Sequence, residues 1–507
     1  MFQYTLVIAI FTLILSPILV FIFGKWNENV AKWMAFGAVL ISAVFALLTI
    51  GDVISLGAYT DNLGGFTLDL GAKQLSINFI LVADSLSLPI AGTIYVLSLA
   101  AIMYSFGYMK EHKNLGLYYA LLVLYVAGMI GVVFAGDLAY FYVFWELMLI
   151  PSYFIIANWG SKPNSVKIAF KYFIFTHVGA MAILIGIGGL WAFADFGITG
   201  GALTIAGYAL SSTVASSTIR LLTILFIVGF SVKMAIFPLH TWLPDTHGEA
   251  PTPISAILSG VMIETAAYAI LRICTDIIGI KGMGGWMRWV LIGFAVFTML
   301  YGVIMAIAQK DTKRLFAYSS ISQMGYIFFG LATFTEFGAT GSMFHIISHS
   351  LAKGSLFMVA GILMTQIGHH KGREIKKLGG LGLKMPITAI VAMVAALSLA
   401  GTPPLAGFMS EWIIFSGGLA ANDTLGIIAV IFAILSTGLT ATYVLLFMKN
   451  VFLGPPKDEF KDVTDPSPYM WVPLVVLAIL SLVIGIFPKS ALYFITDYVA
   501  PLFAGGS

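Results

Sequence analysis

Long apolar runs recur along the whole chain, and they restrict its fold more than any other feature. The first extends from Tyr4 to Phe23 and contains no ionisable side chain except Tyr4 itself. A helix needs about 20 consecutive apolar residues to cross a bilayer. Similar runs follow as far as Trp471–Phe487. The sequence therefore predicts an all-α polytopic membrane protein.

Composition supports membrane insertion and argues against a soluble redox domain. Of the 507 residues, 60% are hydrophobic and only 10% are charged, whereas soluble domains carry roughly 25% charged residues. The single cysteine, Cys274, excludes a Cys-ligated iron–sulfur cluster and an internal disulfide. No glycine-rich nucleotide fingerprint follows a predicted strand. We therefore expect no cofactor and no metal on this chain, so that any redox cofactors would lie on other subunits.

The apolar runs divide into about fourteen predicted spans. The first has no basic region before it and no small-residue cleavage site after it, so we expect a spanning helix rather than a cleaved signal peptide. The predicted spans lie near 4–23, 30–50, 84–107, 116–135, 138–158, 168–193, 219–243, 253–275, 287–308, 314–333, 338–366, 386–416, 425–448 and 470–488.

Lysine and arginine are concentrated in and beside the odd-numbered connections between these spans, as at Lys110, Lys310 and Lys371. Cytoplasmic loops carry an excess of these residues. The bias predicts that both termini lie outside the cytoplasm of a prokaryotic cell, which requires an even number of spans.

The longest polar connection between the predicted spans is 51–78. Polar and apolar residues alternate over Gly65–Phe79, which predicts a small β-hairpin outside the bilayer.

Proline interrupts two predicted spans that lie five spans apart. Pro238 interrupts span seven, and Pro403 and Pro404 interrupt span twelve. Hydrocarbon tolerates a broken backbone ladder only where the freed groups face protein or a water-filled cavity. Corresponding breaks in two five-helix units indicate inverted repeats around a transport path. The expected division is 1–115 for helices 1–3, 116–275 for the first repeat (helices 4–8), 286–450 for the second repeat (helices 9–13) and 451–507 for helix 14.

Ionisable side chains lie deep within several predicted spans. Such groups are costly in a membrane and are functional candidates by default. His345, His349 and Lys353 follow one another at four-residue steps, so they share one helical face. The candidates for ion translocation are Glu146, Lys233, Glu264, His345, His349, Lys353 and Glu411.

These residue types suit proton transfer. Burial shifts the pKa values of carboxyl and lysine side chains toward neutral pH, and a lysine stays protonated only while a carboxylate is beside it. Glu146 and Lys233 are the expected switchable pair, and buried waters would link more distant groups. His240 and His247 are candidates for linking this path to the cytoplasm, and helix capping explains them equally well. Lys171 is a further candidate, although snorkelling to the cytoplasmic surface explains it better.

The stretches around these residues resemble the antiporter-like membrane subunits of respiratory complex I, the Mrp-type sodium/proton antiporters and the energy-converting membrane-bound hydrogenases. The resemblance covers spans two to fourteen. It is carried by Phe144–Pro151, Lys233–Asp245, Glu249–Ser255, Asp311–Gly325 and Gly401–Phe408.

The resemblance implies fourteen helices, inverted repeats of helices 4–8 and 9–13, and broken helices 7 and 12. Glu146 and Lys233 match the glutamate–lysine pair of that family, and Glu411 matches the helix 12 position where the M-type subunit has glutamate. The chain ends soon after its last predicted span, without the long lateral helix of the L-type subunit. The resemblance therefore favours an M-like subunit.

Two positions depart from the family pattern. Glu264 stands in helix 8 where relatives more often have lysine, so the central link between the two half-channels would use a carboxylate. Lys353 beside His349 is closer to the Mrp and hydrogenase branches. The resemblance thus favours a hydrogenase-type or ferredoxin-linked complex over a quinone-reducing one.

The sequence predicts a proton- or sodium-translocating subunit, with ions entering at Glu146 and Lys233 and leaving at Glu411. Expected partners are the lipid bilayer, other membrane subunits and a peripheral redox arm, with no nucleic acid. The alternatives are a member of a multisubunit Na⁺/H⁺ antiporter without redox modules and a non-pumping scaffold. A quinone-binding subunit is a further alternative, but no cavity with quinone-head partners can be identified in the sequence.

Overall fold

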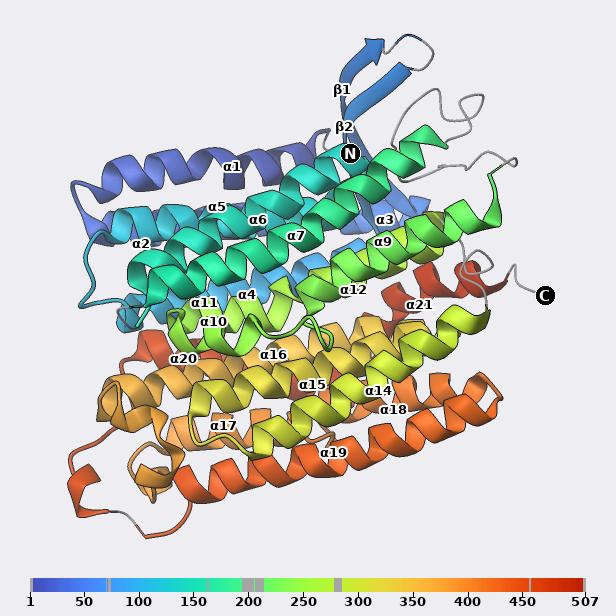
Figure 1. The fold of residues 1–507 in the computed structure, drawn as a ribbon. Coiled ribbons are helices and arrows are strands. Elements are labelled where there is room, and N and C mark those ends of the chain that lie inside the picture. The colour runs from blue at the N-terminus through green and yellow to red at the C-terminus, as the bar shows by residue number, and fades with distance from the viewer. Residues whose placement is uncertain are drawn as a thin grey trace.

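The computed structural model describes residues 3–69, 71, 74–161, 164–193, 205, 214–277, 285–455 and 457–504. Long helices run side by side along one direction, and a two-stranded hairpin extends from one end of the bundle (Figure 1). The N-terminal half contains α1 (Thr5–Gly24), α2 (Glu28–Leu47), α3 (Ile50–Leu56), β1 (Ala58–Asp69), β2 (Gln74–Asp84), α4 (Ser87–Tyr108), α5 (Leu115–Phe134), α6 (Leu138–Trp159), α7 (Ser165–Ala192), α9 (Ser216–Met234), α10 (Leu243–Glu249), α11 (Thr252–Ile257), the π-helical segments η1 (Leu258–Met262) and η2 (Ile270–Ile277), and α12 (Thr265–Ala269) between them.

The C-terminal half is also mainly helical. It contains α14 (Gly285–Ile307), α15 (Thr312–Ala332), α16 (Glu336–Ile367), the short turns η3 (Lys371–Arg373), η4 (Ile375–Lys377) and η5 (Leu381–Leu383), α17 (Pro386–Leu399), α18 (Ala406–Ala420), α19 (Thr424–Val451), η6 (Asp458–Phe460), α20 (Pro468–Ile486) and α21 (Lys489–Ala504).

The predicted helical membrane architecture is confirmed. Within the described ranges, 12 helices are long and apolar enough to cross a membrane. α16 is buried along nearly its whole length at the centre of the bundle. By contrast, α1 and α20 expose much of their apolar surface, as expected of helices that face lipid.

The hairpin predicted over Gly65–Phe79 is present and longer than expected. β1 pairs antiparallel with β2, from Ala58 opposite Asp84 to Asp69 opposite Gln74. The carboxylate of Asp61 accepts backbone hydrogen bonds from the start of α1, including one from Leu6 N at 2.9 Å. The hairpin thus caps the beginning of the first helix.

Both helix interruptions lie where proline occurs in the sequence. α9 ends at Met234 and α10 begins at Leu243, with Pro238 in the non-helical interval. α17 ends at Leu399 and α18 begins at Ala406, with Pro403 and Pro404 between them. The helical hydrogen-bond pattern is therefore broken inside both predicted spans.

Two short helices were not expected from the sequence. α3 lies in the predicted connection 51–78, and α21 follows the last predicted span. The apolar residues Ile495 and Val499 lie four positions apart on α21 and are fully buried, which is the pattern of a helix packed by one face. Its length, 16 residues, is below that of a typical span.

Candidate functional site

Glu146 lies in the middle of α6, and its carboxylate faces α7. Nδ1 of His177 on α7 lies 3.2 Å from both carboxylate oxygens. The histidine ring stacks on Phe173, one turn earlier on the same helix, with 5.3 Å between ring centroids. The first ionisable group of the predicted path therefore has an ionisable partner on the neighbouring helix.

Lys233 lies in the last turn of α9, directly before the helix interruption, and only 2% of it is exposed. Its ammonium lies over the ring of Trp145, 5.4 Å from the centroid. Trp145 precedes Glu146 in α6. Among the described residues, Lys233 and Glu146 do not approach within the 4.0 Å of an ion pair. The structure thus places the expected pair as neighbours beside Trp145, without direct contact.

His177 was missed in the sequence interpretation, although a signal was available. It is an ionisable residue within the apolar run 168–193, and such residues are functional candidates in a membrane.

Replacing His177 by glutamine should lower ion uptake by membrane vesicles several-fold, because the replacement cannot take up or release a proton. His370→Gln, at an exposed position beyond α16, is the matched control and should leave uptake unchanged. Equal uptake by both variants would remove His177 from the path.

Glu264 is a fully enclosed acid at the centre of the site. It lies between the π-helical segment η1 and α12, and none of it is exposed. Its Oε1 contacts Nδ1 of His349 on α16, and its Oε2 accepts a hydrogen bond of 2.8 Å from Ser350. Nε2 of His349 has no hydrogen-bond partner among the described residues. The central acid therefore bridges the two halves of the chain directly.

The polar face of α16 continues from His349 to His345, whose rings are stacked with centroids 6.1 Å apart. Nδ1 of His345 lies 2.8 Å from the hydroxyl of Ser410 on α18, and Nε2 lies 2.8 Å from Oε1 of Gln323 on α15. On the other side of His349, the ammonium of Lys353 donates to the hydroxyl of Ser319 on α15. The expected common face of the three residues is therefore lined by polar partners from neighbouring helices.

Glu411 lies in the second turn of α18, the helix that follows the second interruption, and is 3% exposed. Its Oε2 accepts a hydrogen bond of 2.8 Å from Thr437 on α19, and the hydroxyls of Thr437 and Tyr326 lie 3.0 Å apart. Gly401 has φ +63°, and a Cβ there would lie 2.6 Å from Oε2 of Glu411. The backbone of the interruption therefore packs directly against this carboxylate.

The three candidates for cytoplasmic access have different surroundings. Lys171 donates to Asp245 at 2.8 Å and to the carbonyl of Thr241 at 2.9 Å, which ties α7 to the segment following the first interruption. His240 packs against Tyr301, with 4.7 Å between ring centroids. His247 is fully buried, and neither of its ring nitrogens has a hydrogen-bond partner among the described residues. Nδ1 of the buried His240 likewise has no hydrogen-bond partner among the described residues. Both histidines therefore have buried polar atoms that a water or an ion could satisfy.

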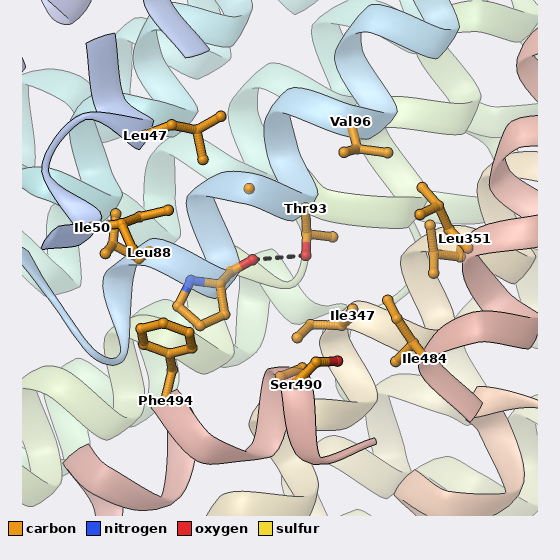
Figure 2. A pocket seen from close by; sticks show the side chains of 14 residues that line it. Leu47, Ile50, Leu88, Thr93, Val96, Ile347, Leu351, Ile484, Ser490 and Phe494 are labelled. Atoms are coloured by element: carbon orange, nitrogen blue, oxygen red, sulfur yellow. Dashed lines mark hydrogen bonds between the residues drawn. The ribbon is translucent and has the colours of Figure 1, made fainter. Parts of the chain in front are cut away.

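Behind the polar face of α16 lies an apolar pocket of ≈ 280 Å³ (Figure 2). Ile347 and Leu351 of α16 line it, together with residues of α2, α3, α4, α20 and α21. The hydroxyl of Thr93 points inward but already donates to the carbonyl of Pro89 at 2.9 Å. Among the described residues that line this pocket, none is acidic, basic or histidine. The candidate ion-handling groups of α16 thus face away from it.

In the described part of the chain, no group of three or more His, Cys, Asp and Glu residues is placed to hold a metal ion. What the arrangement offers instead is a series of buried acids, bases and hydroxyls. Such groups can pass protons or coordinate a small monovalent cation.

Comparison with known proteins identifies the family. The family model described as "NADH:quinone oxidoreductase/Mrp antiporter, TM" matches residues 135–437, and "NADH-Ubiquinone oxidoreductase (complex I), chain 5 N-terminus" matches residues 70–119. The chain belongs to the family of antiporter-like membrane subunits. The first match extends from the start of α6 into α19 and includes every candidate residue.

Relatives occur among several kinds of complex. The chain is 36% identical over 452 residues to a subunit of the Na⁺/H⁺ antiporter of Alkalihalophilus pseudofirmus, covering 84% of this chain but only 54% of that protein. It is 35% identical to the NADH-quinone oxidoreductase subunit N of Desulforudis audaxviator, over 82% of this chain and 84% of that one. It is 33% identical to the F(420)H(2) dehydrogenase subunit M of Methanosarcina mazei, over 82% of each chain.

The fold of this antiporter-like subunit is also found among solved structures. A chain of the Mrp complex from Dietzia sp. DQ12-45-1b superimposes with a TM-score of 0.85, covering 99% of this chain and 98% of that one, at 23% identity. The resemblance that the sequence motifs carried is therefore confirmed at the level of the family and of the fold.

Proposed function

We propose that this antiporter-like subunit moves protons or sodium ions along the buried groups that begin at Glu146 and Lys233 and end at Glu411. The observation that carries the proposal is the polar contact from Glu264 to His349, which joins the two halves of the chain at a fully buried position. From there the stacked rings of His349 and His345 lead toward α18. Together these contacts connect Glu264 to α18, which follows the second helix interruption.

The chemistry follows from burial. The free-energy cost of keeping a buried acid or base ionised depends on the charges and hydrogen-bonding groups next to it. An ion or proton arriving at one group therefore changes the preferred state of the next. The gaps, such as the one between Lys233 and Glu264, require intervening waters, because groups beyond hydrogen-bond reach do not exchange protons directly.

The proposal includes an arrangement in the membrane. We count two further membrane spans besides the 12 long apolar helices: α15, and the broken helix formed by α17 and α18. The total is then about fourteen spans. Residues 116–275 and 286–450 form two inverted repeats, each with one interrupted helix, flanked by 1–115 and 451–507. Both termini lie outside the cytoplasm of a prokaryotic cell, because Lys and Arg are concentrated at the opposite end of the bundle.

The protein works within a larger membrane complex. Its relatives are named as subunits of an Na⁺/H⁺ antiporter, an NADH-quinone oxidoreductase and an F(420)H(2) dehydrogenase. We infer an M-like subunit that contacts other membrane subunits and receives its driving force from a peripheral redox arm of the hydrogenase-type or ferredoxin-linked kind. This chain carries no cofactor, and all electron transfer takes place on its partners.

The second candidate is a role in a multisubunit Na⁺/H⁺ antiporter without redox modules. The antiporter relative from Alkalihalophilus pseudofirmus and the fold of the Mrp complex favour it. Subunits that co-purify with the chain distinguish the two: a hydrogenase-like or dehydrogenase subunit supports the first, and only further antiporter subunits support the second. A non-pumping scaffold would be expected to have Leu or Ala at several of the buried positions that are ionisable in this chain. The ionisable residues at these positions therefore argue against a scaffold.

Glu411→Gln tests the proposed exit. Glutamine keeps the size of the side chain and can accept the hydrogen bond from Thr437, but it cannot release a proton. Ion uptake by inverted vesicles should fall roughly tenfold, the change produced by about 1.4 kcal/mol in a barrier. Glu336→Gln, which removes an exposed carboxylate at the start of α16, is the matched control. If the two variants pump equally, the path does not leave through Glu411.

A further inference from the structure

A second polar site lies at the end of the bundle that carries the hairpin. A cavity of ≈ 480 Å³ opens there between the end of β2, the end of α5, the segment η2 and the C-terminal helix α21. Its lining includes three acidic or basic side chains, Asp84, Asp497 and Arg272. The two acids outnumber the base, so the cavity favours a cation or water over an anion.

The charged groups of this cavity take part in two sets of side-chain contacts, one around Arg272 and one around Asp497. The guanidinium of Arg272 pairs with Asp84 and donates to the hydroxyl of Tyr498 on α21 at 2.6 Å. The hydroxyl of Ser85 donates to Asp497 on α21 at 2.6 Å. Arg272 thus ties η2 to both β2 and α21, across the cavity wall.

Hydrogen bonds lead from the cavity lining to Tyr268, which lies one helical turn from the central acid of the ion path. Nε of Arg272 donates to the hydroxyl of Tyr268 at 3.0 Å, and that hydroxyl donates to the carbonyl of Val133 at 2.7 Å. Val133 also lines the cavity. Glu264, Tyr268 and Arg272 are spaced four residues apart, so successive members lie about 6 Å apart along the segment. Arg272 is the member of this series that lines the cavity, so about two turns of helix, or about 12 Å, separate the cavity from Glu264, with Tyr268 between them.

We propose that this cavity is an aqueous vestibule for a monovalent cation or hydronium, giving Glu264 its own access to the side of the membrane where the chain ends. Arg272, Asp84 and Tyr498 form its gate. When the guanidinium leaves Tyr268, water reaches the hydroxyl of Tyr268, one helical turn from Glu264. The inference rests on the proposed function and adds a central access point to the one at Glu411.

The single cysteine of the chain makes the vestibule directly testable. In a Cys274→Ala background, Val133→Cys places a thiol on the cavity lining, and Val132→Cys places one on the adjacent buried position that does not line it. A membrane-impermeant methanethiosulfonate is added to the assembled complex in oriented vesicles. From the side of the termini, Val133→Cys should react at least about tenfold faster than Val132→Cys. Equal rates, or no reaction of Val133→Cys, would overturn the proposal.

Two further measurements keep the test decisive. Ala135→Cys, on the same lining, replaces Val133→Cys if that variant does not assemble. Adding Arg272→Gln should speed the labelling of Val133→Cys about tenfold, because the gate loses its ion pair with Asp84; an unchanged rate would exclude Arg272 as the gate. Labelling does not depend on ion pumping. A complex that pumps normally but whose Val133→Cys thiol does not react would therefore contradict the proposed vestibule and leave the proposed function standing.

Discussion

Lys233→Ala should abolish ion translocation while leaving the complex assembled. Lys233 is buried in the last turn of α9, where the helix ends, and its ammonium interacts electrostatically with the carboxylate of Glu146. Alanine removes the amine that holds or releases a proton opposite that acid. Glu146 and His177 would then lose the buried base that lies beside Trp145.

The measurement is ion uptake by inverted vesicles that contain the whole complex. Uptake by the Lys233→Ala variant should fall to the level of vesicles lacking this chain, while the partner subunits still co-purify in normal amounts. Lys449→Ala, at an exposed position near the end of α19, is the control for loss of a lysine and should pump normally. Wild-type uptake by Lys233→Ala would refute the proposed entry pair.

The helices could be predicted from the sequence because a membrane leaves the backbone few choices. A run such as Tyr4 to Phe23 must satisfy its own backbone groups in hydrocarbon, and a helix achieves this within one segment. The interruptions were predictable for the related reason that Pro238 and Pro404 lack a backbone donor. The isolated ionisable residues were evident because so few polar groups lie in these apolar runs.

The partners of those residues could not be predicted, because they depend on how distant helices pack. Glu264 and His349 are 85 positions apart in the sequence, and Asp84 and Arg272 are 188 positions apart. Neutral residues such as Ser350 are common in membrane helices and carry no signal of their own. The structure therefore contributed the contacts, including that of Glu146 with a histidine of α7 in place of a direct pair with Lys233.

Glu264→Gln should slow ion translocation at least roughly tenfold, corresponding to about 1.4 kcal/mol in the limiting barrier. Glutamine retains the volume of the side chain and can still accept the hydrogen bond from Ser350, so the packing between η1 and α16 should be preserved. The carboxylate that faces His349 is lost, and with it the acid that joins the two halves of the chain at this point. Vesicle uptake and co-purification of the partner subunits measure the two effects separately.

A double-variant comparison shows whether Glu264 and His349 act on the same step. If ions pass through both, Glu264→Gln combined with His349→Gln should be little slower than either single variant, because the path is already interrupted. Independent contributions would instead multiply the two losses. Normal uptake by Glu264→Gln would mean that the two halves work separately, because no acid at this position would then be needed to join them.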